Sequence, residues 1–131
     1  MLGNPVPILR SFDEARTKDF YLDFLGFDFV FEHRFEPGMP LYMGVRQGVC
    51  TLHLSEHYGD ATPGGAVRIP VDDVTAYAAT LRAKRHGNAR PGVLQETPWG
   101  TREIMIQDPA SNRLTFFTEL ANYRQAYATS D

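Results

Sequence analysis

The sequence predicts an α+β fold built from two βαβββ modules, with two curved mixed sheets around a cleft and helices on the outer faces. Three observations predict it. The order strand, helix, strand, strand, strand occurs twice, at a spacing of about 60 residues. Several strands alternate between apolar and polar side chains, as expected where one face packs against a helix. Residues 98–117 form a β-hairpin, because the turn Asp108-Pro-Ala-Ser-Asn112 separates two alternating runs.

The first predicted module covers residues 5 to about 58. Its short apolar strand, residues 6–10, is followed by a helix that Asp13 can cap and that Gly26 can end. The buried stripe expected for this helix consists of Phe20, Tyr21, Phe24 and Leu25.

Three strands complete this module, over residues 27–35, 41–46 and 49–55. The first is unusually aromatic. Strict alternation places five of its side chains on one side, with Val30 and Glu32 on the other. These five are Phe27, Phe29, Phe31, His33 and Phe35.

The second predicted module covers residues 64 to about 119, after a Gly/Pro-rich connector, and a tail, residues 120–131, ends the single domain 1–131. A strand over residues 66–71 leads to a helix that Asp72 or Asp73 caps. Its expected buried stripe is Val74, Tyr77, Ala78 and Leu81. A strand near residues 91–97 and the hairpin follow.

The strands of both modules have one apolar and one mixed face. The apolar face is expected to pack under the helices, and consists of Leu9, Leu52, Leu54, Val67, Ile69, Ile104, Ile106, Leu114 and Phe116. Cys50 shares this register, which indicates packing rather than a reactive thiol. The inner face suits a ligand, and consists of Val6, Ile8, Arg10, Thr51, His53, Ser55, Ala66, Arg68, Glu103, Met105, Thr115 and Phe117.

Composition narrows the class of protein. The net charge is −3, from 13 basic and 16 acidic residues, which argues against a nucleic-acid partner. No apolar run is long enough to span a membrane, and the N-terminus does not resemble a signal peptide. The single cysteine fits a reducing compartment. We therefore expect a soluble cytoplasmic protein.

Two motifs resemble a known family. Lys18-Asp-Phe-Tyr-Leu-Asp-Phe-Leu-Gly-Phe27, and Pro98-Trp-Gly through Asp108-Pro-Ala-Ser-Asn112, are similar to the glyoxalase / bleomycin-resistance (vicinal oxygen chelate) superfamily. The resemblance spans residues 5 to about 119, and the second motif is similar to the bleomycin-resistance branch. Ser111 departs from the pattern, since the family often has glycine in this turn. Asn112 is then expected to take the left-handed conformation.

The resemblance implies four metal-ligand positions in the enzymes of the superfamily, which here hold Val6, His53, Ala66 and Thr115. Only His53 is of a ligand type, and a tight site needs three or four ligands. His57 lies roughly 13 Å along the strand from His53, at about 3.3 Å per residue, too far to share one ion. We therefore expect no metal, no other cofactor and no catalytic residue.

Seven residues are candidates for binding a small molecule: Phe31, Phe35, His53, Arg68, Trp99, Glu103 and Thr115. Each has an alternative role. His53 can be a satisfied structural histidine or pair with Glu103 as acid and base, and Arg68 can simply pair with Glu103 across adjacent sheets. The aromatic side chains can be core residues, and Trp99 can pack against a dimer partner instead of stacking on a ligand.

The resemblance implies a homodimer whose interface holds bleomycin-class glycopeptides and so sequesters them without any reaction. One alternative is a lyase or isomerase of the superfamily with an altered site. Another is a binder of a different small molecule.

Overall fold

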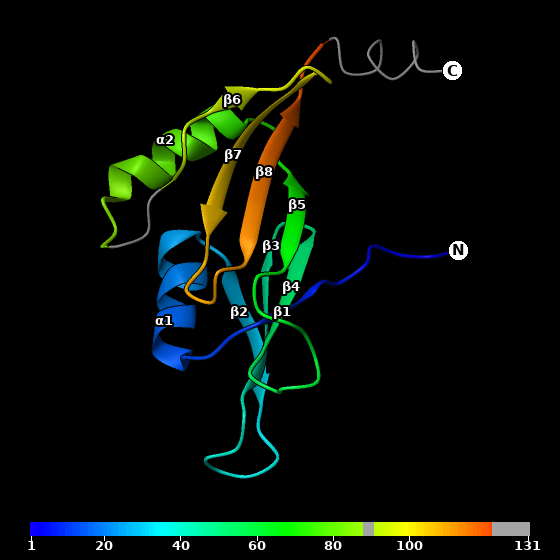
Figure 1. Cartoon of the computed structure of the whole chain (residues 1–131), viewed down its shortest axis with the longest axis vertical. Coiled ribbons are helices and arrows are strands. Elements are labelled where there is room, and N and C mark those ends of the chain that lie inside the picture. The colour runs from blue at the N-terminus through cyan, green and yellow to red at the C-terminus, as the bar shows by residue number, and fades with distance from the viewer. Residues whose placement is uncertain (88–90, 122–131) are drawn as a thin grey trace. The chain divides into compact units, whose positions relative to one another are not determined.

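The computed structural model describes residues 1–87 and 91–121 and contains the two expected modules (Figure 1). The first consists of β1 (Ile8–Arg10), α1 (Glu14–Lys18), the π-helical continuation η1 (Asp19–Phe24), β2 (Asp28–His33), β3 (Tyr42–Gln47) and β4 (Cys50–Ser55). The second consists of β5 (Ala66–Pro70), α2 (Val74–Lys84), β6 (Gln95–Glu96), β7 (Thr101–Gln107) and β8 (Arg113–Glu119). The predicted α+β class with two βαβββ modules is confirmed.

Each module contributes one four-stranded sheet. The strand order is β1-β4-β3-β2 in the first sheet and β5-β8-β7-β6 in the second. In the first sheet β1 pairs with β4 in parallel, and the other pairs are antiparallel, so this sheet is mixed.

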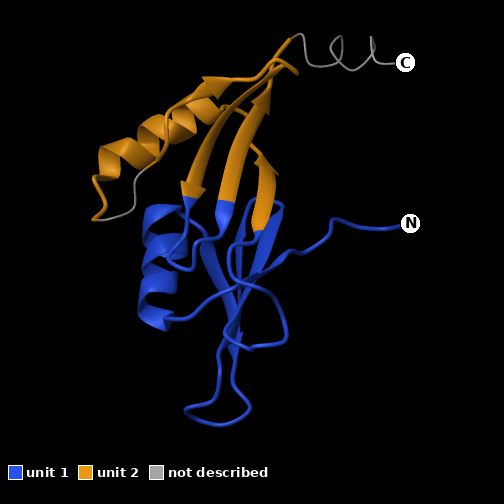
Figure 2. Ribbon diagram, in the orientation of Figure 1, with its two compact units in different colours: residues 1–65, 107–113 blue, residues 66–106, 114–131 orange. Residues whose placement is uncertain are grey.

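The chain forms two compact units (Figure 2). Unit 1 consists of Met1–Gly65 and Gln107–Arg113, and unit 2 consists of Ala66–Ile106 and the chain from Leu114 on. The turn of the β7–β8 hairpin thus belongs to unit 1, although most of both arms belongs to unit 2. Of the predicted tail, residues 122–131 lie outside the described part of the chain.

The helix caps follow the prediction. The Asp13 carboxylate accepts a hydrogen bond from the backbone N–H of Arg16 at 3.0 Å, and Gly26 takes a left-handed φ of 84° after η1. Asp73, not Asp72, caps α2 by accepting from the N–H of Ala76 at 3.1 Å. In η1 the N–H of Leu25 donates to the carbonyl of Phe20, five residues back, which is the bond that defines a π-helix.

The predicted alternation of the aromatic strand is wrong. Between Phe29 and Phe31 the β2–β3 register shifts, so that Phe29 pairs with Val45 and Phe31 with the adjacent Gly44. A β-bulge therefore places Phe29 on the helix side of the sheet, where its ring lies 5.5 Å from the Lys18 ammonium group. Phe31 lies on the opposite, inner face.

The predicted apolar face is confirmed. Eight of its nine members are buried and Val67 is half-buried. In unit 2 the Tyr77 ring of α2 packs against Phe116, with 5.1 Å between centroids. The predicted inner-face residues are exposed or half-buried, with the exception of Ser55. Ser55 is fully buried and donates a hydrogen bond to Asp60 at 2.6 Å.

The hairpin turn differs from the prediction in one residue. Ser111, not Asn112, has the left-handed φ, at 67°. Asn112 is held in the hairpin opposite Asp108, because its carbonyl accepts from the Asp108 N–H at 2.9 Å. Its buried side chain donates to the carbonyl of Arg10 and accepts from the N–H of Gly65. The turn is therefore part of the polar interior of unit 1.

Truncation of the apolar face is expected to be costly. Leu54→Ala and Ile106→Ala each remove a fully buried aliphatic side chain, so each should lower the free energy of unfolding by roughly 2–5 kcal/mol. Thr115→Ala, on the half-buried inner face, should cost much less. Urea unfolding of the three variants checks this, and equal losses in all three would contradict the assignment of the faces.

Candidate functional site

In unit 1 the inner face carries a cluster of three rings: Phe31, Tyr42 and His53. The Phe31 ring stacks on Tyr42 at 6.1 Å and meets His53 edge-on at 5.2 Å. Gly44 lies between Phe31 and His53 in the sheet and makes room for the cluster. A Cβ atom at Gly44 would lie 2.4 Å from Cε1 of Phe31, so the ring rests directly on the strand backbone.

His53 has a partner inside this cluster. Its Nδ1 lies 2.7 Å from the Tyr42 hydroxyl. Partial burial lowers the pKa of His53 below its ordinary value, which favours the neutral imidazole. The pKa of Tyr42 is raised, mainly by burial and to a smaller extent by the charge of Asp60, so its hydroxyl keeps its proton. The pair therefore offers hydrogen bonds but no charge at neutral pH.

The pH titration of His53 should reflect this environment. We expect its imidazole NMR signals to titrate with a midpoint below 6.5, and those of the urea-unfolded chain to titrate near 6.5. Because the unfolded chain then binds the proton more tightly, His53 should make the protein less stable as pH falls through this interval. A midpoint above 6.5 in the folded protein would contradict this.

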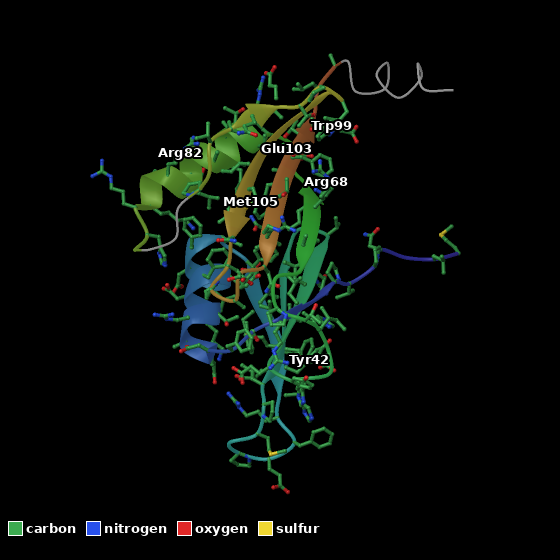
Figure 3. All side chains as sticks on the ribbon, in the orientation of Figure 1. Tyr42, Arg68, Arg82, Trp99, Glu103 and Met105 are labelled. Carbon is green, nitrogen blue, oxygen red and sulfur yellow. The ribbon has the colours of Figure 1, made fainter. Side chains whose placement is uncertain are left out.

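In unit 2 the inner face carries an ion pair between Arg68 of β5 and Glu103 of β7 (Figure 3). Nη2 of Arg68 lies 2.8 Å from Oε2 of Glu103, and the guanidinium carbon lies 4.6 Å from the centre of the Phe117 ring. The Thr101 hydroxyl also donates to Glu103, at 2.8 Å. The hydrogen bond from Arg68 is the main reason why the pKa of Glu103 is lowered. The two residues pair, as one of the predicted alternatives had it, but within a single sheet and not across adjacent sheets.

The other predicted residues of unit 2 are accessible. Trp99 lies in the loop before β7, between Pro98 and Gly100, and 45% of its surface is exposed. Met105 is exposed to a similar extent, and Thr115 is half-buried. In unit 1, Phe35 lies beyond the end of β2, is 76% exposed, and meets the His33 ring edge-on with 5.4 Å between the ring centroids. These side chains are available to a ligand or a partner.

Metal-binding residues do not gather in the part of the chain that the structure describes. No group of three or more His, Cys, Asp or Glu side chains there is placed to hold an ion. Cys50 is half-buried, and burial raises the pKa of its thiol, which disfavours the nucleophilic thiolate.

Sequence reasoning did not select Tyr42, Gly44 or Thr101. Gly48 and Val49 form a two-residue turn between β3 and β4, and Gln47 pairs with Cys50 across it. This register places Gly44 opposite His53, and Tyr42 opposite Ser55, two residues further along. Counting back along both strands from the turn would have found Gly44 and Tyr42 as neighbours of His53. A depression of about 300 Å³ in unit 1 was also not predicted, and none of the seven candidates lines it.

Comparison with protein families identifies the chain. The model of a family described as "Glyoxalase superfamily protein" matches residues 2–122. The chain belongs to the glyoxalase superfamily. No match was found among curated proteins.

Solved structures of the superfamily share the fold. A bleomycin-binding protein from bleomycin-producing Streptomyces verticillus, complexed with copper(II)-bleomycin, is 29% identical, with a TM-score of 0.68 over 88% of this chain and 95% of that one. A glyoxalase/bleomycin resistance protein from Streptomyces sp. CB03234 is 25% identical, with a TM-score of 0.69 over 87% and 98%. Lactoylglutathione lyase from Agrobacterium tumefaciens is 20% identical, with a TM-score of 0.68 over 88% and 92%.

The helices of this superfamily member are short. Within residues 1–87 and 91–121, none combines the length and the apolar character needed to cross a membrane.

Proposed function

We propose that this superfamily member binds and sequesters an antibiotic of the bleomycin class in the cytoplasm, as a single-domain homodimer that makes and breaks no covalent bond. The observation that carries the proposal is the exposed Trp99 platform on a chain that also presents exposed aromatic side chains on β2. Planar ring systems in a ligand favour such surfaces. The likeness to a bleomycin-binding protein at 29% identity supports the ligand class.

The residues proposed to contact the ligand are Phe31, Phe35 and His53 of unit 1 and Arg68, Trp99, Glu103 and Thr115 of unit 2. Unit 1 offers ring faces and a neutral hydrogen-bonding imidazole. Unit 2 offers the exposed Trp99 ring and an internally balanced ion pair. Each set suits a ligand with flat heteroaromatic parts and amide groups, because stacking and hydrogen bonding can act together.

A homodimer is proposed because β2 is an edge strand of the first sheet and all six of its residues are exposed. Exposed apolar surface on a sheet edge usually marks an interface. Light scattering at micromolar concentration should give twice the chain mass of 14.8 kDa. A monomeric mass would remove the dimer from the proposal.

The test of the function is a calorimetric titration with metal-free and copper(II)-loaded bleomycin, followed in parallel by the fluorescence of the single tryptophan. Saturable binding with a change in Trp99 emission is expected. Mass spectrometry of the recovered drug should show it unchanged. No binding of either form would reject the bleomycin assignment.

The alternative is an enzyme, a lyase or isomerase with an altered site. The Tyr42–His53 hydrogen bond at 2.7 Å favours it, because such a pair can exchange a proton with a substrate. Recovery of chemically altered drug, lost in a His53→Gln variant, would support the enzyme over the binder.

A further inference from the structure

The depression of about 300 Å³ in unit 1 is a second place where a ligand can bind. It lies at the end of the first sheet where β1, β2 and β4 stop and the β2–β3 loop extends past the strands (Figure 1). We propose that it binds a small primary ammonium ion with an apolar body, and that Glu56 is the anion that pairs with the ligand. The inference is independent of the proposed function, because none of the residues proposed there lines the depression. Its lining includes Ser11, Phe12, Arg34, Met39, Pro40 and Glu56.

The Glu56 carboxylate is fixed in position and keeps one oxygen for a ligand. The N–H of Glu56 donates to the carbonyl of Leu41 at 2.9 Å, and the N–H of Leu41 donates back to Oε1 of Glu56 at 3.1 Å. Within residues 1–87 and 91–121, no basic side chain forms an ion pair with this half-buried carboxylate. Oε2 of Glu56 is therefore free to accept from a cationic ligand.

Ser11 provides a second acceptor beside Glu56. β1 and β4 run parallel with Arg10 opposite Ser55, and the N–H of Ser11 extends this pairing by donating to the carbonyl of Ser55 at 2.8 Å. Ser11 is only 5% exposed, yet its hydroxyl has no hydrogen-bond partner in the described part of the chain.

The Ser11 hydroxyl is nevertheless accessible. Among the described residues, Nε of Arg10 is the only side-chain nitrogen or oxygen that is both fully buried and unbonded, so the unbonded Ser11 hydroxyl must reach the surface. An ammonium group has three N–H donors, and can bond this hydroxyl and the Glu56 carboxylate together.

The walls of the depression are apolar. The Phe12 side chain is 57% exposed and the Met39 side chain 44% exposed. The guanidinium carbon of Arg10 lies 4.9 Å from the centre of the Phe12 ring, which holds the ring in place, and Nη1 of Arg10 donates to the carbonyl of His57 at 2.7 Å. Ligand pockets usually have volumes of about 300–1,000 Å³, so this depression suits a ligand with a single ring or a short chain.

The other charge in the lining is already balanced. Nη1 of Arg34 donates to the carbonyl of Met39 at 2.7 Å, and Nη2 forms an ion pair with Glu14 of α1. Arg34 therefore holds the rim of the depression without cancelling the charge of Glu56. A ligand of the opposite charge to Glu56 is favoured.

The experiment uses three probes with the same ring: benzylammonium, neutral benzyl alcohol and anionic benzoate. Their dissociation constants are measured by NMR chemical-shift titration of the full chain and of Glu56→Gln, Ser11→Ala and Glu36→Gln. Glutamine keeps an oxygen that can accept from the N–H of Leu41. Glu36→Gln is the matched control, because Glu36 is an exposed carboxylate of the same β2–β3 loop that does not line the depression. Thermal midpoints establish that the variants are folded.

Benzylammonium should bind the wild-type protein in the millimolar range and shift the backbone amide signals of Phe12 and Met39. Glu56→Gln should weaken this binding about tenfold or more, as expected for loss of a charge-assisted hydrogen bond. Ser11→Ala should weaken it about two- to tenfold, and Glu36→Gln should leave it unchanged. Benzyl alcohol should bind at least about tenfold more weakly than benzylammonium, and benzoate should not bind.

Four results would overturn the inference. These are benzoate binding as tight as that of benzylammonium, equal losses in Glu56→Gln and Glu36→Gln, shifts confined to residues outside the depression, and no saturable binding of benzylammonium. Bleomycin titrations of the wild-type protein keep the two proposals separate. If benzylammonium binds and the drug does not, the proposed function fails and this inference stands. The reverse result rejects this inference alone.

Discussion

Replacement of Asp108 by alanine is expected to cause the largest loss of stability of any single change considered, about 3–5 kcal/mol. The buried carboxyl group of Asp108 accepts four hydrogen bonds inside unit 1. One oxygen accepts from the N–H groups of Ala110 and Asn112, and the other from the Tyr21 hydroxyl at 2.6 Å and the Asn112 amide. Alanine would leave all four donors buried without this acceptor.

Two further variants make this expectation specific. Tyr21→Phe removes one donor together with its bond, so it should cost only about 1 kcal/mol. Burial raises the pKa of Tyr21 well above its ordinary value, so this loss should not vary with pH near neutrality. Asp28→Ala, an exposed aspartate on β2, should be nearly neutral. Urea unfolding compares the three, and an Asp108→Ala loss no larger than that of Asp28→Ala would show that the network contributes little.

Replacement of Trp99 by alanine is expected to weaken drug binding roughly ten- to a hundredfold, at about 1.4 kcal/mol per tenfold change. Ring stacking contributes about 0.5–1.5 kcal/mol beyond burial, and the buried area adds about 1–2 kcal/mol. Because nearly half of the side chain is exposed in the free protein, folding should change little. Calorimetric titration with bleomycin and thermal unfolding of both proteins check the two halves of this expectation.

The matched control is Tyr58→Ala. Tyr58 is also an exposed aromatic residue, 93% accessible, and is not among the proposed ligand contacts. Its replacement should leave the dissociation constant unchanged. If Trp99→Ala binds the drug as well as wild type does, Trp99 is not part of the site. Equal losses in both variants would indicate nonspecific adsorption to aromatic surface.

The element order, both helix caps and the apolar faces could be predicted from the sequence because each depends on local spacing. Asp13 and Asp73 lie directly before apolar stripes of helical period, and Leu52 and Leu54 alternate as a half-buried strand must. These signals are repeated over several residues and tolerate a local irregularity.

The features that could not be predicted each depend on one residue of register. The bulge in β2 separates Phe29 from Phe31, although the sequence alternates without interruption. The Tyr42–His53 contact likewise requires the pairing of two strands rather than the pattern of one. Ser111 takes the left-handed conformation while the Asn112 side chain is bonded to Arg10 and Gly65, and turn propensity alone shows neither feature.

The division of the β7–β8 hairpin between the two units limits where the gene can be truncated or recombined. The backbone passes between the units three times, after Gly65, after Ile106 and after Arg113. A gene truncated after the codon of Gly65 would encode Arg10, Tyr21 and Gly65 without the Asp108 and Asn112 side chains that bond to them. The two sequence halves therefore cannot be exchanged between relatives as independent cassettes. A recombination junction that preserves unit 1 must carry residues 107–113 along with the N-terminal half.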